Sequence, residues 1–409
     1  MRAPVSDRLT PARPFKLAAA AGLLTLAVMA ALLGAARDAR AARGMEVALQ
    51  DDAAFVSQSY FDRMRALARA RSLGVTRLRV NANWAFLMPH DQAYSPTKPA
   101  TVAYTFTQID SAIDAAAAYG IRVHLSLTGP APAWATSDHR VGPVRPSATE
   151  FAQFAAAAAR HFRGRVDRYS IWNEPNWRTW LGPLNSSPAL YRALYLAGYR
   201  AIKAQDGRAK VLIGETAPYA QRGRAIAPIE FLRAVTCVNA RYRRVRRCSR
   251  LRADGYAHHP YDFTHSARFR FPGRDNATMA TLSNLTGALD RLSRAGVLRP
   301  TRGRRMPVYL TEYGYFASGS RHLPWRRAVT YLKQGWDLAL RNSRVRSQLQ
   351  YLLVSPPPGS PYRFFDLGLI SVNGSRHPTY NALRSWYRKN RRKVKRLGGR
   401  IALPVAPPF

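Results

Sequence analysis

Residues 109–127 read IDSAIDAAAAYGIRVHLSL, and this stretch contains one complete helix-to-strand unit. Apolar residues recur at helical spacing up to Gly120, and glycine commonly follows the last helical turn because it adopts a left-handed backbone conformation without steric penalty. The next segment, IRVHLSL, is short and rich in branched residues, as buried strands are. A helix that leads directly into a buried strand is the repeating element of a parallel sheet.

The same unit recurs along the chain from Met45 onward. Gly74, Gly164 and Gly207 precede other strand candidates in the same way as Gly120. We expect eight strands, at residues 45–50, 75–81, 121–127, 166–172, 209–214, 253–259, 306–312 and 348–354. Eight such units predict an α/β fold, a (β/α)8 TIM barrel that forms a single catalytic domain over residues 45–387. The alternative is an open, doubly wound sheet, but the first strand lacks the glycine-rich phosphate loop that often follows it there.

The composition excludes several classes of protein. The 409 residues are 47% hydrophobic and 21% charged, which is enough apolar material for a large core and is not typical of disorder. Cys237 and Cys248 are too few for a disulfide-scaffolded small domain, a four-cysteine zinc site or an iron–sulfur protein. No metal or other cofactor is expected. In an oxidising compartment the two cysteines are expected to form a structural disulfide bond, the alternative being two unrelated thiols.

The first 41 residues indicate export. Four basic residues precede an uncharged apolar run at residues 17–36, and Ala-Arg-Ala at 39–41 has the small-x-small pattern of a cleavage site. The segment 1–41 is thus expected to be a signal peptide or, because its apolar run can span ~30 Å of hydrocarbon, a retained membrane anchor. The remainder would then be secreted or anchored to the outer face of the cytoplasmic membrane.

The high positive charge has two interpretations. The chain carries 64 Lys and Arg against 23 Asp and Glu, and the basic residues are almost all arginines spread over its length. This pattern fits a base-composition bias, and because no nucleic-acid-binding motif accompanies it, no nucleic-acid partner is expected. The alternative is a polyanionic partner, including an acidic glycan. The basic, Pro-rich segment 388–409 is expected to be a solvated tail, with attachment to anionic wall polymer or lipid as the alternative.

Two glutamates close predicted strands on opposite sides of the barrel. Only six glutamates occur in the chain; Glu174 follows the fourth strand in WNEPN and Glu312 ends the seventh in LTEYG. Active sites of (β/α)8 barrels lie at the carboxyl ends of the strands, so the two side chains should meet. Glycosidic bond cleavage needs such a pair, one carboxyl protonated and one ionised. The alternative for either residue alone is an ion pair with one of the many arginines.

These residues resemble a known group of enzymes. The chain is similar to the retaining glycoside hydrolases of clan A, in the manner of glycoside hydrolase families 5 (cellulase-like) and 39, over most of residues 45–387. The resemblance rests on LRV at 78–80, NEP at 173–175, HPY at 259–261, TEYG at 311–314 and GLISVNGSRHPTYNALRSW at 368–386.

The resemblance implies roles at individual positions. Glu174 would be the general acid/base and Glu312 the nucleophile of a double displacement. Asn173 would hold the sugar 2-hydroxyl, Arg79 would keep Glu312 ionised, and Tyr261 would donate a hydrogen bond to it.

Further residues are expected around this pair. His259 would contact Glu174 or the substrate, with a core histidine as the alternative. Glu215 closes the fifth strand and is a candidate contact either of the substrate or of the residues that touch the substrate. Trp84, Trp134 and Trp177 follow the second, third and fourth strands and would stack on sugar rings, unless they pack in the core.

The eighth strand departs from the family pattern, which usually places an aromatic residue, often Trp, at its end. Here the predicted strand runs into VSPPPGSPYRFFD, so Ser355 and prolines follow it. Either Tyr362 or Phe364 folds in as the platform, or the sugar subsite is built differently.

The sequence therefore predicts an exported glycosidase that hydrolyses O-glycosidic bonds of a β-linked oligo- or polysaccharide with net retention. The alternative is an inactive barrel that binds carbohydrate or polyanions outside the cell, and membrane or wall association through either terminus would fit both.

Overall fold

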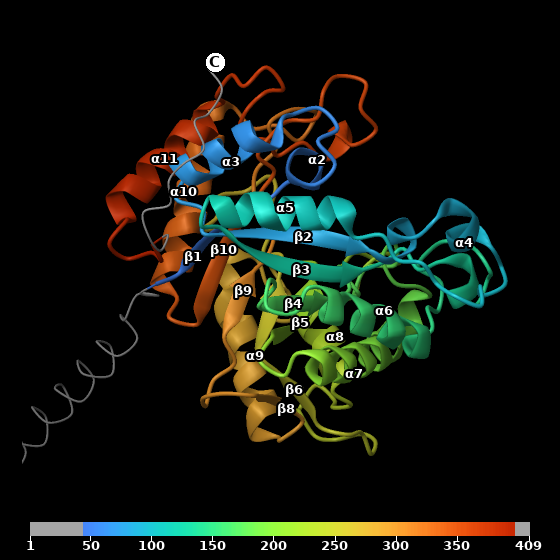
Figure 1. Cartoon of the computed structure of the whole chain (residues 1–409). Coiled ribbons are helices and arrows are strands. Elements are labelled where there is room, and N and C mark those ends of the chain that lie inside the picture. Colours follow the sequence, from blue (N-terminus) through green and yellow to red (C-terminus); the bar gives the residue numbers. More distant parts are fainter. Residues whose placement is uncertain (1–43, 397–409) are drawn as a thin grey trace, which may run out of the picture. The chain divides into compact units, whose positions relative to one another are not determined.

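The computed structural model describes residues 44–396, and its central element is a closed barrel of eight parallel strands (Figure 1). The strands follow one another around the barrel in the order β1, β2, β3, β4, β5, β7, β9 and β10, and β10 pairs with β1 to close it. They span Glu46–Gln50 (β1), Arg77–Asn83 (β2), Arg122–Thr128 (β3), Arg168–Ile171 (β4), Lys210–Thr216 (β5), Gly255–His258 (β7), Val308–Leu310 (β9) and Val345–Tyr351 (β10).

Helices connect these strands and cover the outside of the barrel (Figure 1). A small parallel sheet of β6 (Leu251–Ala253) and β8 (Leu298–Pro300), which the sequence did not predict, lies beside them. The α-helices are α2 (Asp52–Phe55), α3 (Arg63–Ser72), α4 (His90–Tyr94), α5 (Thr107–Ala118), α6 (Ala148–His161), α7 (Ser187–Gln205), α8 (Pro228–Val235), α9 (Leu282–Arg294), α10 (Trp325–Arg341) and α11 (Pro378–Asn390).

The predicted (β/α)8 barrel is confirmed, and the doubly wound sheet is excluded because the sheet has no edge. Seven strands fall within a few residues of their predicted positions. The eighth was predicted at 348–354 but spans Val345–Tyr351, so its carboxyl end lies three residues earlier. This shift changes which residue of the last strand faces the mouth.

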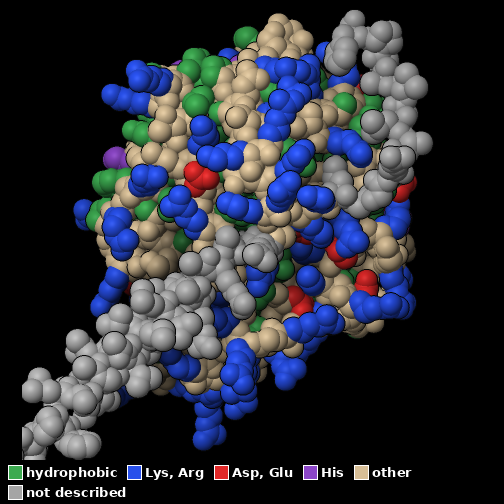
Figure 2. All heavy atoms as spheres, turned by 90° about the vertical axis from the view of Figure 1, so that its left-hand side faces the viewer, with side chains coloured by type: hydrophobic (Ala, Val, Ile, Leu, Met, Phe, Trp, Pro, Cys, Tyr) green, Lys and Arg blue, Asp and Glu red, His purple; other side chains and the backbone are tan. Residues whose placement is uncertain are grey.

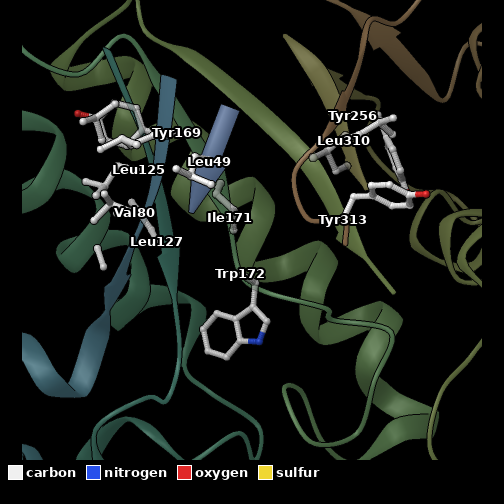
Figure 3. Packing of buried hydrophobic residues seen from close by; sticks show 14 of the residues in the cluster. Leu49, Val80, Leu125, Leu127, Tyr169, Ile171, Trp172, Tyr256, Leu310 and Tyr313 are labelled. Atoms are coloured by element: carbon white, nitrogen blue, oxygen red, sulfur yellow. The ribbon is translucent and has the colours of Figure 1, made fainter. Parts of the chain in front are cut away.

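The main apolar core lies between the strands and the surrounding helices. Side chains alternate across a strand, so Leu78 and Val80 of β2 pack towards the helices whereas Arg77 and Arg79 point into the barrel. Figure 3 shows part of this core, in which Leu49, Val80, Leu125, Tyr169 and Ile171 come from β1 to β4. The barrel interior therefore has room for buried polar groups.

A cluster of charged side chains lies at the amino-terminal ends of the strands, and its buried members are Glu46, Arg77 and Arg168. This base cluster consists of Glu46, Arg77, Asp167, Arg168 and Lys395. Glu46 Oε2 lies 3.1 Å from Arg77 Nε and 2.7 Å from Arg168 Nη1, and Oε1 lies 3.1 Å from Lys395 Nζ. Asp167 pairs with the other side of Arg77 at 2.6 Å. Burial opposes ionisation of Glu46, but Arg168 and Arg77 outweigh it and hold the pKa of this carboxyl well below its usual range.

The barrel extends past the boundary predicted at residue 387. Helix α11 continues to Asn390, Val394 forms a parallel bridge to Met45, and the Lys395 N–H donates to the Met45 carbonyl. The first residues of the predicted tail thus pack against the base of the barrel. The predicted signal or anchor at 1–41 and the rest of the tail lie outside the described residues.

Two further findings concern the described part of the chain. The expected disulfide bond between Cys237 and Cys248 is present and closes the arginine-rich loop that follows α8. None of the helices between residues 44 and 396 has the length and apolar composition needed to cross a membrane.

Candidate active site

The loop after β4 places Glu174 at the mouth of the barrel. Trp172 is fully buried, its N–H donates to the Leu127 carbonyl, and its indole Nε1 donates to the Trp180 carbonyl at 2.7 Å. The Glu174 N–H donates to the Glu215 carbonyl at 2.8 Å. Trp172 and Glu174 have φ of 68° and 36°, in the left-handed region that disfavours residues with a Cβ. Such conformations cluster at functional sites, where surrounding contacts hold them.

Glu312 faces this loop from the other side of the barrel. It follows β9, and both of its carboxyl oxygens are hydrogen-bonded. Arg79 Nη1 donates to Oε1 at 2.9 Å and the Tyr261 hydroxyl donates to Oε2 at 3.1 Å. These are the two partners that the resemblance implied for Glu312, and they fix the orientation of its carboxyl group.

His259 brings the two carboxyl groups together. Its Nδ1 lies 3.0 Å from Glu174 Oε1 and 3.7 Å from Glu312 Oε2. Because both oxygens are close to one nitrogen, they lie within ~7 Å of each other, a separation suited to carboxyl pairs that cleave glycosidic bonds. The predicted meeting of the ends of the fourth and seventh strands is thus seen in the structure.

Glu215 lies beneath this pair and is closed off from solvent. Its Oε2 lies 2.8 Å from His259 Nε2 and 3.3 Å from Arg79 Nη2, and it accepts from the Thr311 hydroxyl at 2.6 Å. The side chain is 0% exposed, whereas those of Glu174 and Glu312 are each 11% exposed. Of the two roles expected for Glu215, direct contact with substrate is therefore wrong, because the side chain is enclosed; its Oε2 instead positions His259 and Arg79, which reach Glu174 and Glu312.

We call Glu174, Glu215, Glu312, Arg79 and His259 the mouth cluster. Burial disfavours a charged His259, but the charge of Glu312 and hydrogen bonds to Glu174 and Glu215 outweigh it and raise the His259 pKa to about 10. Burial likewise opposes ionisation of Glu215, yet Arg79 and His259 hold its pKa well below the usual range. Burial raises the pKa of Glu312, against the opposing charges of His259 and Arg79.

The charges of the mouth cluster do not balance without a proton. Arg79 and His259 supply two positive charges, and three carboxyl groups face them. Since the lowered pKa of Glu215 keeps it ionised, one further carboxylate makes the cluster neutral, and the third carboxyl group is in surplus. One protonated and one ionised carboxyl is the state that acid-assisted nucleophilic attack requires.

Asn173 and Tyr351 line the same site. Asn173 Oδ1 accepts from Arg79 Nη2 at 3.0 Å, and its amide nitrogen has no hydrogen-bond partner within residues 44–396, so it is available to a ligand hydroxyl. Tyr351 ends β10, pairs in register with Gln50 and interacts electrostatically with Glu312. Tyr362 and Phe364 are 69% and 73% exposed. These two side chains therefore do not fold in as a platform, and the structure agrees with the alternative of a subsite built differently, in which Tyr351 is the aromatic residue at the end of the last strand.

The three tryptophans are placed differently from one another. Trp84 is fully buried and packs against Trp134, Phe151 and Phe154, so its predicted role in sugar stacking is wrong. Trp134 is half-buried, with its indole N–H donating to the Gln92 carbonyl. Trp177 is half-buried in the loop that follows Glu174 and remains a candidate platform.

Sequence reasoning missed three contacts of the mouth cluster. Gln50 Oε1 and Ser126 Oγ accept from Arg79, and Thr311 donates to Glu215. All three lie at or near strand ends, so the alternation of inward and outward positions was the signal for them. Within residues 44–396, no group of three or more His, Cys, Asp or Glu side chains is arranged to hold a metal ion.

The fold and the site together define the class of protein, a (β/α)8 barrel with a pair of carboxyl groups at its mouth. No family model matches the sequence, and no curated protein matches it significantly. Solved structures do share the fold. A family 39 glycoside hydrolase from Bacteroides cellulosilyticus aligns with TM-score 0.57 at 18% identity, over 84% of this chain and 63% of that one.

Two further solved structures are similar. A monomeric beta-xylosidase from Caulobacter crescentus aligns with TM-score 0.55 at 19% identity, over 84% of this chain and 69% of that one. GH5_18 from Streptomyces cattleya, solved in complex with GlcNAc, aligns with TM-score 0.58 at 18% identity, over 86% and 81%. The resemblance to families 5 and 39 is thus confirmed in the fold, and at these identities the fold is what the likeness shows.

Proposed function

We propose that this protein is an exported glycosidase that hydrolyses β-linked oligo- or polysaccharides with retention of anomeric configuration. The observation that carries the proposal is the contact of one nitrogen, His259 Nδ1, with both Glu174 and Glu312. The imbalance of charge in the mouth cluster adds to it, because three carboxyl groups there face only two cationic side chains. The likeness in fold to a beta-xylosidase and to a family 39 glycoside hydrolase is in agreement.

In the first step, a carboxylate oxygen of Glu312 attacks the anomeric carbon of the sugar. The bond from that carbon to the leaving oxygen breaks as Glu174 transfers its proton to this oxygen. Arg79 and Tyr261 hold Glu312 in position through both of its oxygens. The products are a glycosyl ester on Glu312 and the departing alcohol.

In the second step, Glu174 removes a proton from water as the water oxygen attacks the anomeric carbon. The ester bond breaks, Glu312 returns to its carboxylate form and Glu174 is again protonated. Retaining pairs lie about 5 to 5.5 Å apart and inverting pairs about 6.5 to 9.5 Å. The contacts of His259 with both groups limit the distance between Glu174 Oε1 and Glu312 Oε2 to ~7 Å, which is compatible with the retaining separation.

The test is covalent trapping of the nucleophile. The full chain is assayed with 4-nitrophenyl β-glycosides of xylose, glucose, mannose and N-acetylglucosamine, and the best sugar is then used as its 2-deoxy-2-fluoro derivative with a reactive leaving group. We expect time-dependent inactivation and one adduct per chain, on the peptide that contains Glu312. Glu230→Gln, a change of an exposed glutamate in α8, should trap normally, and Glu312→Gln should not.

Two other results would contradict the proposal. If the product has inverted configuration and no adduct forms, the protein is a hydrolase, but the double-displacement mechanism is wrong. Binding of the sugars without turnover, retained in Glu312→Gln, would support the inactive carbohydrate-binding barrel instead.

Export is the second part of the proposal and rests on the sequence of residues 1–41. It is tested by expressing the full chain in a bacterial host, fractionating the cells and determining the N-terminus of the recovered protein. A start at Ala42 outside the cytoplasm indicates a cleaved signal peptide, and a membrane-bound start near Met1 indicates an anchor. Recovery from the cytoplasm with an intact N-terminus would contradict export.

A further inference from the structure

The base of the barrel, where the strands begin, is strongly basic. Three segments there, which we call the base loops, are residues 241–252, 299–305 and 391–396. They contain no Asp or Glu, and their exposed cations are Arg241, Arg243, Arg244, Arg246, Arg247, Arg250 and Arg252 in the first, Arg299, Arg302, Arg304 and Arg305 in the second, and Arg391, Arg392, Lys393 and Arg396 in the third. Figure 2 views the molecule from the side on which β1 begins, and Lys and Arg far outnumber Asp and Glu on that face.

The carboxyl groups near the base are already engaged. Asp167 pairs with Arg77 and Arg122, and Asp254 pairs with Lys203. Among the ion pairs formed within residues 44–396, the only one that involves a cation of the base loops is that of Lys395 with Glu46. The positive charge of the exposed arginines in the base loops is therefore not neutralised by the described part of the protein.

The two largest base loops are held in place rather than hanging free. The disulfide bond between Cys237 and Cys248 closes the first of them, and its strand β6 pairs with β8 at the start of the second. Val245 stands among the arginines of the first loop with 63% of its surface exposed. A fixed array of guanidinium groups around an exposed aliphatic side chain suits the interface of an anionic bilayer, where guanidinium groups meet phosphates and the aliphatic group meets acyl chains.

The chain enters the barrel at this same face. Met45 bridges to Val394, between β1 and the third base loop. The apolar run ends at Ala36, so about eight residues separate it from the start of the described chain, a reach of at most ~30 Å. If that run is inserted in a membrane, the base loops are the part of the barrel nearest the lipid.

We propose that the base loops form a docking surface for anionic phospholipid, which holds the barrel with its catalytic mouth directed away from the membrane. Charge complementarity and the entry point of the chain both favour lipid over a soluble polyanion. Because the mouth lies at the opposite ends of the strands, docking leaves it open to polysaccharide. The proposal does not depend on the glycosidase activity, which can fail without affecting it.

The experiment measures sedimentation of the full chain with vesicles of phosphatidylcholine alone or with 30% phosphatidylglycerol, at 50 and 300 mM NaCl. An inserted apolar segment would bind both vesicles, so the quantity of interest is the ratio of the two affinities. Each cation near an anionic surface strengthens binding about fivefold. We expect at least tenfold tighter binding to the anionic vesicles at low salt and a ratio that falls at high salt.

Charge reversal locates the surface. The triple variant Arg243→Glu, Arg244→Glu, Arg247→Glu should lose at least tenfold of the anionic preference. The matched variant Arg222→Glu, Arg224→Glu, Arg268→Glu, on exposed arginines of the mouth loops, should keep it. In a third variant, the same three arginines of the base are changed to Gln, and its thermal unfolding midpoint is measured to check that it is folded. If charge is the cause, this variant should lose less of the anionic preference than the Arg→Glu triple does.

Three results would overturn the proposal. Equal affinity for both vesicles would remove the anionic lipid as partner. Equal losses in the base and mouth variants would make the effect one of net charge. Binding to poly-glutamate as tight as to anionic vesicles would assign the surface to a soluble polyanion.

Discussion

The base and mouth clusters are both charge networks built around buried residues of one barrel, but they differ in how their carboxyl groups are neutralised. At the base, the two carboxylates are Glu46 and Asp167, and the three cations that face them are Arg77, Arg168 and Lys395. At the mouth, three carboxyl groups share two cations. The base cluster therefore has a surplus of positive charge, whereas the mouth cluster has one carboxyl group more than it has cations.

The difference separates a structural charge network from a chemical one. A carboxylate with surplus cations has a lowered pKa and is fixed in one protonation state, which stabilises the fold. A carboxyl group that lacks a cationic partner is able to carry a proton and pass it to a substrate. The difference in exposure has the same direction, because the side chains of Glu174 and Glu312 are each 11% exposed and that of Glu46 is 6% exposed.

The largest expected effect comes from Glu312→Gln at the mouth. The amide keeps the size of the side chain but cannot form the glycosyl ester. We expect kcat/KM for the best aryl glycoside to fall roughly 10⁴-fold or more. The thermal unfolding midpoint should not fall, because the variant relieves the crowding of three carboxyls. Retained activity in steady-state assays of the purified variant would show that the mouth cluster isn't the chemical site.

The second effect is expected at the base, in Glu46→Gln. This change removes a carboxylate that faces three cations, two of them almost completely buried. Breaking such buried pairs typically costs about 3 to 5 kcal/mol. Urea unfolding should show that loss, while kcat of the folded variant stays unchanged because the base cluster is at the far end of the barrel. A fall in kcat comparable to that of Glu312→Gln would contradict the conclusion that the base cluster is structural and the mouth cluster is chemical.

The pH dependence of the unfolding free energy provides a control for the Glu46→Gln variant. The folded pKa of Glu46 is lowered, so its stabilising contribution is present above the unfolded value of about 4.3 and is lost as the pH falls further. The difference in unfolding free energy between the natural chain and Glu46→Gln should therefore shrink below pH 4.

Much of the fold was readable from the sequence because helix and strand periods alternate clearly. The exception, β10, has polar inward residues such as Ser347 and an apolar continuation, LLV, that follows its end, so hydrophobicity placed it three residues late. That error hid Tyr351 as the aromatic residue of the mouth. A strand that lines a polar barrel interior cannot be located by apolar content alone.

The sequence predicted which strand ends carry the site residues, but not how deeply each side chain is buried. Strand-end glutamates identified the mouth, yet Glu215 and Glu174 look alike in sequence and differ only in how far each lies below the surface. Trp84 similarly follows a strand, but the helix packed over it provides Phe151 and Phe154, which enclose it. Depth depends on long-range packing, which local patterns do not record.

The smallest of the three expected effects concerns Glu215 and tests how its charge controls the titration of His259 within the mouth cluster. In Glu215→Gln, His259 loses one of the carboxylates that raise its pKa to about 10, so its titration should move to lower pH. We expect a shift of about one pH unit, ~1.4 kcal/mol, measured from the ¹⁵N chemical shifts of the imidazole. The alkaline limb of the kcat/KM profile should move in the same direction, since the cluster then gives up a proton more easily.

The stability of the Glu215→Gln variant provides an independent check of the direction in which the pKa of His259 is shifted. A histidine whose folded pKa is raised stabilises the fold fully below its unfolded value of about 6.5, and this contribution is lost as the pH rises towards the folded pKa. The decline in unfolding free energy between pH 7 and pH 10 should thus be smaller in Glu215→Gln than in the natural chain. Glu150→Gln, which breaks the surface pair with Lys98, should leave both the His259 titration and this decline unchanged. If His259 titrated alike in all three proteins, Glu215 would be a packing residue, and the imbalance of charge at the mouth would not control its proton.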